Sequence, residues 1–170
     1  DTIRSVLLVA FGKQGVRVAE RDVGEVFTLS GNVVTRDGTE MMEVGGRRAG
    51  SLPEAGLARL RGVQTEPLGE ARLRGEIVDS KCFLGRMRPG QGRAHRACAQ
   101  LCIAGGIPPV LATRASEGGE GHYLLADREG RSIAQELLSE VAIPVELSGR
   151  LERRADLVIL KIDLEDIRRL

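Results

Sequence analysis

The chain has 170 residues, which is enough for one domain or two small ones with a substantial buried core. It contains three phenylalanines, one tyrosine and no tryptophan, so the core has to be built from Val, Leu, Ile and Ala. Basic and acidic residues number 25 and 24, and the net charge of +1 excludes a broad positive field that would attract nucleic acid or anionic lipid. No run of about 18 apolar residues occurs, which excludes a transmembrane helix within this chain.

The first 65 residues have the pattern of a partial or small OB-like β domain. A strand is predicted at residues 6–11, and a Gly-rich connection follows it. A β-hairpin is predicted next, at residues 29–44, with Asp37-Gly38 as its turn. The stretch after the hairpin is rich in Gly, Arg, Ser and Pro, and it predicts a loop or linker with a short helix at residues 53–60. We therefore expect a smaller or truncated barrel over residues 1–65.

The remaining residues, 66–170, have the pattern of a complete OB-like barrel with an insertion. The predicted elements are strands at 71–79, 110–113 and 122–127, a helix at 132–141 and two closing strands. This is the element order of the five-stranded OB barrel. Another helix, predicted at 93–103 and ended by Gly105-Gly106, falls between the first two strands. The chain is thus predicted to be mainly β, with two small OB-like β-barrel domains, the second with residues 80–109 inserted as a Cys/His-bearing loop and helix.

A weak internal repeat supports two related barrels. The pattern Leu-x-Gly-x-aliphatic occurs three times, beginning at Leu29, Leu73 and Leu147. The first and third copies also lead, at the same offset, to a second apolar segment, which indicates two equivalent β-hairpins. Glycine in the middle of a strand commonly marks a bulge or a sharp bend, so the repeat predicts curled strands.

The chemically distinctive residues lie close together in the insertion. Cys82, His95, Cys98 and Cys102 have the spacing C-x12-H-x2-C-x3-C, and the three cysteines are all that the chain contains. Residues at i, i+3 and i+7 share one face of an α-helix, so His95, Cys98 and Cys102 point the same way if their segment is helical. A Cys3His set predicts a metal site. Zinc is the first choice, because thiolates and imidazole are its usual ligands.

Other chemistry is compatible with the same residues. A Cys3His set also suits an iron–sulfur centre, and copper would fit with Met87 as a supplementary soft ligand. Alternatively, a disulfide from Cys82 to one of the other two cysteines would staple the insertion, leave one free thiol and need no cofactor. Asp79 and Lys81 flank Cys82 and are interpreted as surface charge, because neighbouring residues of a strand point to opposite faces.

Two segments resemble an uncharacterised bacterial family. They are G-E-I-V-D-S-K-C, which ends at Cys82, and H-R-A-C-A-Q-L-C-I-A-G-G-I-P-P, which begins at His95. Members of that family carry GEIVDxKC, a Gly/Pro-rich loop and HRACAxxCIxGGIPP, usually after a membrane anchor. The resemblance covers the second half of the chain well and the first half loosely. It implies that the four Cys and His residues act as a unit. It also implies a membrane-tethered protein in the periplasm or at the cell exterior, with the anchor before Asp1.

Three functional hypotheses follow from these observations. The first is a non-catalytic metal-binding accessory or assembly module, in which an OB-like barrel presents the inserted site to a protein partner in a membrane-associated complex. The second is a thiol-redox or electron-transfer protein, built on a disulfide and free thiol or on an iron–sulfur centre. The third is oligonucleotide binding, a common role of OB barrels. It is least favoured, because the aromatic side chains on which bases stack are scarce.

Overall fold

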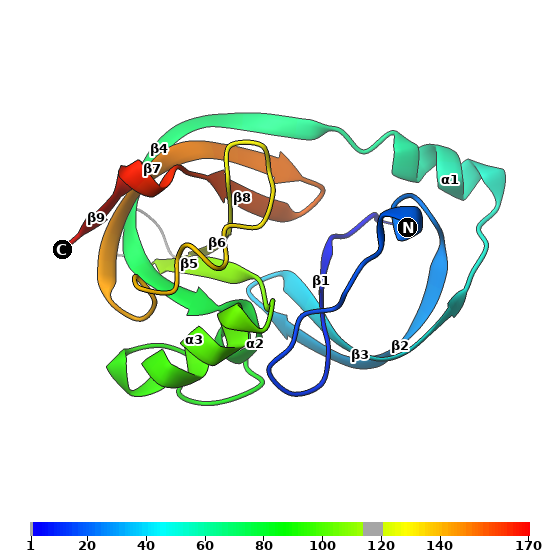
Figure 1. The fold of residues 1–170 in the computed structure, drawn as a ribbon. Coiled ribbons are helices and arrows are strands. Elements are labelled where there is room, and N and C mark those ends of the chain that lie inside the picture. The colour runs from blue at the N-terminus through cyan, green and yellow to red at the C-terminus, as the bar shows by residue number, and fades with distance from the viewer. Residues whose placement is uncertain (1, 114–120) are drawn as a thin grey trace.

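The structure is a computed structural model that describes residues 2–113 and 121–170, and it contains two β-sheets (Figure 1). The smaller, N-terminal sheet has the strand order β1-β3-β2. Its strands are β1 (Val6–Val9), β2 (Phe27–Arg36) and β3 (Thr39–Ala49). A 3-10 turn, η1 (Glu20–Asp22), lies between β1 and β2. β1 runs parallel to β3, whereas β2 and β3 form an antiparallel hairpin.

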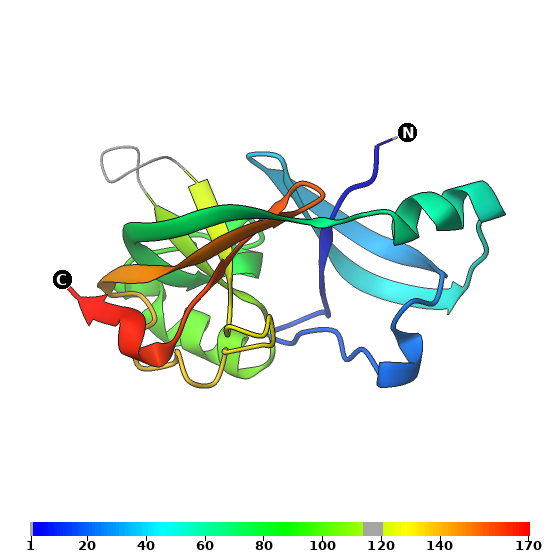
Figure 2. The same ribbon diagram turned by 90° about the horizontal axis from the view of Figure 1, so that it is seen from above.

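A helix and a long strand connect the two sheets. The helix α1 (Glu54–Arg61) follows β3, and β4 (Thr65–Asp79) runs from it across to the barrel (Figures 1 and 2). The short helix predicted at residues 53–60 is therefore confirmed. The connection is shorter than predicted, because β3 continues to Ala49.

The C-terminal sheet closes into a five-stranded barrel. After β4, its strands are β5 (Pro109–Thr113), β6 (Gly121–Ala126), β7 (Pro144–Arg154) and β8 (Leu157–Lys161). They follow one another in the order β4-β5-β6-β8-β7, and β7 pairs with β4 to close the ring. The β6–β8 pairing is parallel. This is the strand order of an OB barrel, so the prediction of a mainly β chain with an OB-like barrel is confirmed.

Short elements complete the barrel and its insertion. At the C-terminus, η4 (Leu164–Asp166) leads to β9 (Ile167–Arg169), which pairs with β7. The helices of the insertion are α2 (Ser80–Phe83), η2 (Arg93–His95) and α3 (Arg96–Ala104). The helix predicted at residues 93–103 is thus present, with a 3-10 first turn. None of the helices within residues 2–113 and 121–170 has the length and apolar character needed to cross a lipid bilayer.

The N-terminal sheet has the same strand arrangement as the last three strands of the barrel. β1, β2 and β3 pair with one another as β6, β7 and β8 do. The predicted turn joins β2 to β3, with φ of 49° at Asp37 and 81° at Gly38, as a type I′ turn requires. The equivalent turn between β7 and β8 places Ala155 at a φ of 52°. The expected smaller OB-like unit is therefore a separate three-stranded sheet.

The glycines of the sequence repeat lie where neighbouring strands come very close. A Cβ atom on each of them would overlap a backbone carbonyl oxygen of the next strand. The pairs are Gly31 with Glu43, Gly75 with Ala112, and Gly149 with Lys161. The register of β2 also shifts between Ser30 and Gly31, as expected for a bulge. The repeat therefore marks close backbone approaches in the curled sheets.

Replacing Gly149 with alanine is expected to lower the free energy of unfolding by about 1–3 kcal/mol, because the added methyl group overpacks the β7–β8 pair. Urea denaturation followed by circular dichroism measures the change. Gly56→Ala in α1 is the matched control. The nearest atom to its added methyl group would be 3.6 Å away, so alanine should stabilise the helix by up to about 1 kcal/mol. Equal effects of the two variants would contradict the proposed crowding at Gly149.

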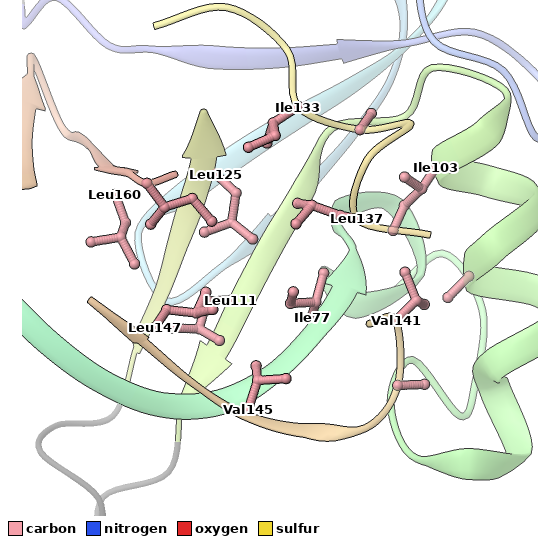
Figure 3. Close-up of a cluster of buried hydrophobic side chains, with 14 of the residues drawn as sticks. Ile77, Ile103, Leu111, Leu125, Ile133, Leu137, Val141, Val145, Leu147 and Leu160 are labelled. Carbon is pink, nitrogen blue, oxygen red and sulfur yellow. The ribbon is translucent and has the colours of Figure 1, made fainter. Parts of the chain in front are cut away.

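The barrel encloses an aliphatic core (Figure 3). Side chains of all five strands point into it, and Ile103 of α3 and Leu137 of the β6–β7 connection pack against them. Both are fully buried, as is Ile77 of β4. The insertion is therefore anchored to the barrel through the apolar face of α3.

The helix predicted at residues 132–141 is wrong, since this segment forms a series of turns. The Leu138 carbonyl accepts a hydrogen bond from the side chain of Gln100 in α3, at 2.9 Å. The backbone N–H of Ala142, its helical partner, instead donates to the Ile77 carbonyl at 2.9 Å. An isolated helix of about ten residues is marginal, so these contacts with the barrel and α3 decide the backbone path.

A second buried cluster joins the N-terminal sheet to the barrel and the insertion. Its buried members are Leu7, Val9, Met41, Val78, Cys82, Phe83, Leu84, Cys102, Ile107, Val110 and Ala112. They come from β1, β3, β4, β5, α2, α3 and the residue segments that follow the two helices. Because two of the three cysteines belong to this cluster, packing between the two halves of the chain positions the candidate site.

Candidate metal centre

Two helices of the insertion bring the three cysteines together. Cys82 lies in α2, directly after the end of β4, and Cys98 and Cys102 lie one turn apart in α3. Their sulfur atoms lie within 4.8 Å of one another, and none of the three forms a disulfide. The loop after α2 folds back tightly, because Gly90 lies against the backbone of Cys82 with no room for a Cβ.

His95 is buried and bonded to Asp79. Its Nε2 atom lies 2.8 Å from Oδ2 of Asp79, and Oδ1 of the same carboxylate accepts a 2.8 Å hydrogen bond from the Cys82 backbone N–H. Ligand atoms of Asp79, Cys82 and His95 form a second group within 4.8 Å. The four predicted site residues are thus brought together as two overlapping groups that share Cys82.

A lysine from the N-terminal half of the chain lies against the thiols. Nζ of Lys13 is 2.7 Å from the sulfur of Cys98 and 4.0 Å from that of Cys102. The backbone holds this loop in place, because the Gly15 N–H donates to the Gly105 carbonyl at 2.9 Å. The hydrogen bond to Cys98 raises the pKa of Lys13 above its usual value. An ammonium group in this position stabilises a deprotonated thiol.

The thiols of Cys82 and Cys102 differ in acidity. Their mutual hydrogen bond, then burial and the nearby charge of Asp79, raise the pKa of Cys82 far above its usual range. The same hydrogen bond lowers the pKa of Cys102, with the charge of Lys13 acting in the same direction. Cys102 is therefore the thiol of this pair that loses its proton first, while Cys82 retains its proton as the donor.

A buried ion pair lies beside the thiols. Nζ of Lys81 is 2.6 Å from a carboxylate oxygen of Glu43, and it donates to the carbonyl oxygens of Ala10 and Gly12 at 2.7 Å. The hydrogen bond from Lys81 lowers the pKa of Glu43. The second oxygen of Glu43 is 2.9 Å from Arg86. This network ties β3 and the loop after β1 to the insertion.

The interpretation of Asp79 and Lys81 as surface charge is wrong. Asp79 is fully buried, and the Lys81 side chain is 5% exposed. The reason is that β4 ends, and α2 begins, at the junction between the N-terminal sheet and the barrel. Each of the two flanking residues therefore faces a packed element and finds a partner there.

Two cavities border the site. One, of about 470 Å³, is lined by Cys82 and Cys102 together with the charged residues Lys13, Glu43, Lys81 and Arg86. The other, of about 610 Å³, is lined by residues of α2, of the loop that follows it and of the end of β2. Cys82 and Met87 line both. Two of the three thiols therefore border a cavity, although their side chains are buried.

No protein-family model, curated protein or solved structure matches this chain. The function of the chain therefore has to be inferred from the donor atoms of the site. Three thiols with an adjacent ammonium and a carboxylate–imidazole pair are a set that binds soft or borderline metal ions. The same set, without a metal, holds one acidified thiol beside a cavity.

Sequence reasoning missed Lys13 as a residue of the site. A signal was available, because the chain has only three lysines among 25 basic residues. Each lysine makes a close polar contact in the structure: Lys13 with Cys98, Lys81 with Glu43, and Lys161 with Glu152. Lysine is a compact point charge that fits a narrow site better than the planar arginine side chain does.

Proposed function

We propose that this chain binds one thiophilic metal ion, zinc in the first instance, on the thiolates of Cys82, Cys98 and Cys102. The observation that carries the proposal is the approach of the three sulfur atoms to within 4.8 Å of one another without a disulfide. Two sulfurs bound to the same tetrahedral zinc at about 2.3 Å lie about 3.8 Å apart. A small inward movement of the side chains therefore gives the ligand geometry.

The surroundings suit a negatively charged metal–thiolate centre. Zinc with three thiolates carries a single negative charge, and the Lys13 ammonium lies 2.7 Å from the Cys98 sulfur to offset it. Metal binding requires that Cys82 give up the proton that it donates to Cys102. The zinc ion would take the place of that proton between the sulfur atoms.

Asp79 and His95 are proposed to position Cys82. Asp79 caps α2 through the Cys82 N–H, and its other oxygen is held by His95. Hydrogen bonds from outer residues orient metal ligands in this way. His95 as a fourth ligand stays a prediction, because its imidazole groups with Asp79 and Cys82 and not with all three sulfurs.

The biological role proposed for the site is that of a non-catalytic accessory or assembly module in a membrane-associated complex outside the cytoplasm. Support for this setting comes from the resemblance of the segments around Cys82 and His95 to a membrane-anchored bacterial family. The barrel supplies a rigid base for the inserted site, since α3 packs into its core. Capture of a protein partner that depends on loaded metal is the test of this role.

Protein purified without an affinity tag is expected to contain about one zinc per chain by elemental mass spectrometry. Three thiols should react in denaturant with a chelator present, because none is oxidised. Iron or copper at the same ratio would support the metal site but would change the identity of the bound metal. A metal-free chain that shows a single reactive thiol, and that fails to take up added zinc after reduction, would contradict the proposal.

A thiol-redox function is the second candidate. The favouring observation is that Cys82 and Cys102 line a cavity, with the Lys13 ammonium 4.0 Å from the Cys102 sulfur, since thiol exchange begins with a thiolate. This function predicts a disulfide that forms and breaks reversibly between two of the cysteines. Thiol counts after treatment with oxidised and reduced glutathione distinguish it from the metal site.

A further inference from the structure

The cavity beside the thiols is rich in positive charge. Its described lining residues include three cations, Lys13, Lys81 and Arg86, and one carboxylate, that of Glu43. Lys81 is held by Glu43 and two backbone carbonyls. Arg86 also contacts Glu43, at 2.9 Å, but its side chain is 45% exposed. Lys13 reaches the sulfurs from the surface. Two cations can therefore turn toward a ligand in the cavity.

Two of the three proposed metal ligands line the same cavity. Cys82 and Cys102 are both in its wall, and its volume of about 470 Å³ leaves room for a small molecule. A structural zinc site is closed by four protein ligands, whereas three protein ligands leave the fourth position to a solvent or substrate molecule. Within the described residues, the group that holds all three sulfurs contains no fourth His, Asp or Glu.

We propose that the bound metal keeps one coordination position open toward this cavity, and that this position takes a small monoanion with a sulfur or nitrogen donor atom, such as a thiolate or thiocyanate. The inference rests on the metal site of the proposed function. It adds a ligand class that the three-thiolate site does not require by itself.

The balance of charges in the cavity sets the sign of the ligand's charge. A divalent metal with three thiolates carries one negative charge, and Glu43 carries another. Lys13, Lys81 and Arg86 carry three positive charges, so the metal site and the lining residues together leave one positive charge. Asp79 does not line the cavity, and its two oxygens are bound by His95 and the Cys82 N–H. A monoanion neutralises the remaining positive charge, whereas a cation would be repelled. Glu43 is the one carboxylate among the described lining residues, and it is already paired with Lys81 and Arg86.

The chemistry of the metal sets the softness of the donor atom. Thiolates select soft and borderline metals, and such metals prefer a sulfur or nitrogen donor to a hard oxygen donor. The exposed thioether of Met87 at the cavity adds further polarisable surface. A monoanion with a sulfur or nitrogen donor atom therefore fits both the charge and the lining of the cavity.

Cobalt(II) in place of zinc tests the metal site and the open position in one sample. The sulfur-to-cobalt charge-transfer absorption reports thiolate ligation, and the visible d–d bands report the complete coordination shell. The cobalt-loaded protein is titrated with sodium thiocyanate, with sodium nitrate keeping the ionic strength constant. We expect a saturable change of the d–d bands with the charge-transfer absorption retained, and no change with nitrate alone.

Variants of the cavity cations test the charge argument. Lys13→Met combined with Arg86→Met is expected to weaken the apparent thiocyanate affinity at least about tenfold, because two positive charges next to the anion are lost. Arg88→Met is the matched control. Arg88 lines the second cavity and not this one, so the affinity should be unchanged.

The outcomes separate the two proposals. Charge-transfer absorption with d–d bands that do not respond to saturating thiocyanate overturns the open position and leaves the metal site intact. Lack of charge-transfer absorption overturns the metal site and this inference with it. An affinity that is the same in the double variant and the native protein overturns the assignment of the anion to this cavity.

Discussion

Replacing Lys81 with methionine is expected to lower the free energy of unfolding by about 3–5 kcal/mol, the usual effect of breaking a buried ion pair. The substitution removes one of the two cationic partners of Glu43, which is 2% exposed, and leaves Arg86 as the other. It also removes the two hydrogen bonds that hold the carbonyls of Ala10 and Gly12. Urea denaturation in the presence of a chelator measures the loss without a contribution from metal.

Two controls separate charge from packing at this position. The double variant Lys81→Met with Glu43→Leu removes both charges, so much of the lost stability should return. Lys161→Met breaks a cross-strand pair with Glu152 of the same 2.6 Å length whose side chains are more exposed, at 17% and 15%. A loss of about 1 kcal/mol or less is expected there. If Lys81→Met costs no more than Lys161→Met, the buried pair does not hold the two halves together.

Replacing Cys102 with serine is expected to abolish the stabilisation that zinc provides. With free zinc buffered at about a thousand times its dissociation constant, the native chain should gain about 4 kcal/mol of unfolding free energy over its chelated form. The serine variant should gain little, since a hydroxyl group is a poor substitute for a buried thiolate in a soft donor set. Paired denaturation curves with zinc buffer and with chelator give both values.

Met87→Leu is the control for this experiment. Met87 also carries sulfur and lines the same cavity, but the group of three converging sulfurs does not include it. Its substitution should leave the gain from zinc unchanged. Retention of the full gain in Cys102→Ser, or its loss in Met87→Leu, would reject the three-thiolate site.

The barrel could be predicted because its pattern is local. Each strand carries its own alternation of apolar and polar residues. Each L-x-G copy places a glycine where the next strand approaches, as at Gly149. The segment at residues 132–141 could not be predicted in the same way. Its apolar spacing suited a helix, but the hydrogen-bonding partners of Leu138 and Ala142 are Gln100 and Ile77, which are distant in sequence.

The candidate site could be predicted only in part. The spacing of Cys98 and Cys102 is helical and places them on one face, and α3 confirms this. The bond of His95 to Asp79 was not predicted, because the strand pattern gave no sign that Asp79 would be buried. Lys13 was missed because 85 positions separate it from Cys98.

The amino-acid sequence by itself determined the β elements, the glycine positions and the set of thiols, because these depend on backbone preference and on spacing within single segments. Only the tertiary structure decided which charges face those thiols. Lys13, Glu43 and Lys81 come from separate segments that meet where the N-terminal sheet packs against the barrel. Burial at that junction requires every charge to find a partner, and the partners are chosen by packing between distant segments and not by any pattern along the chain.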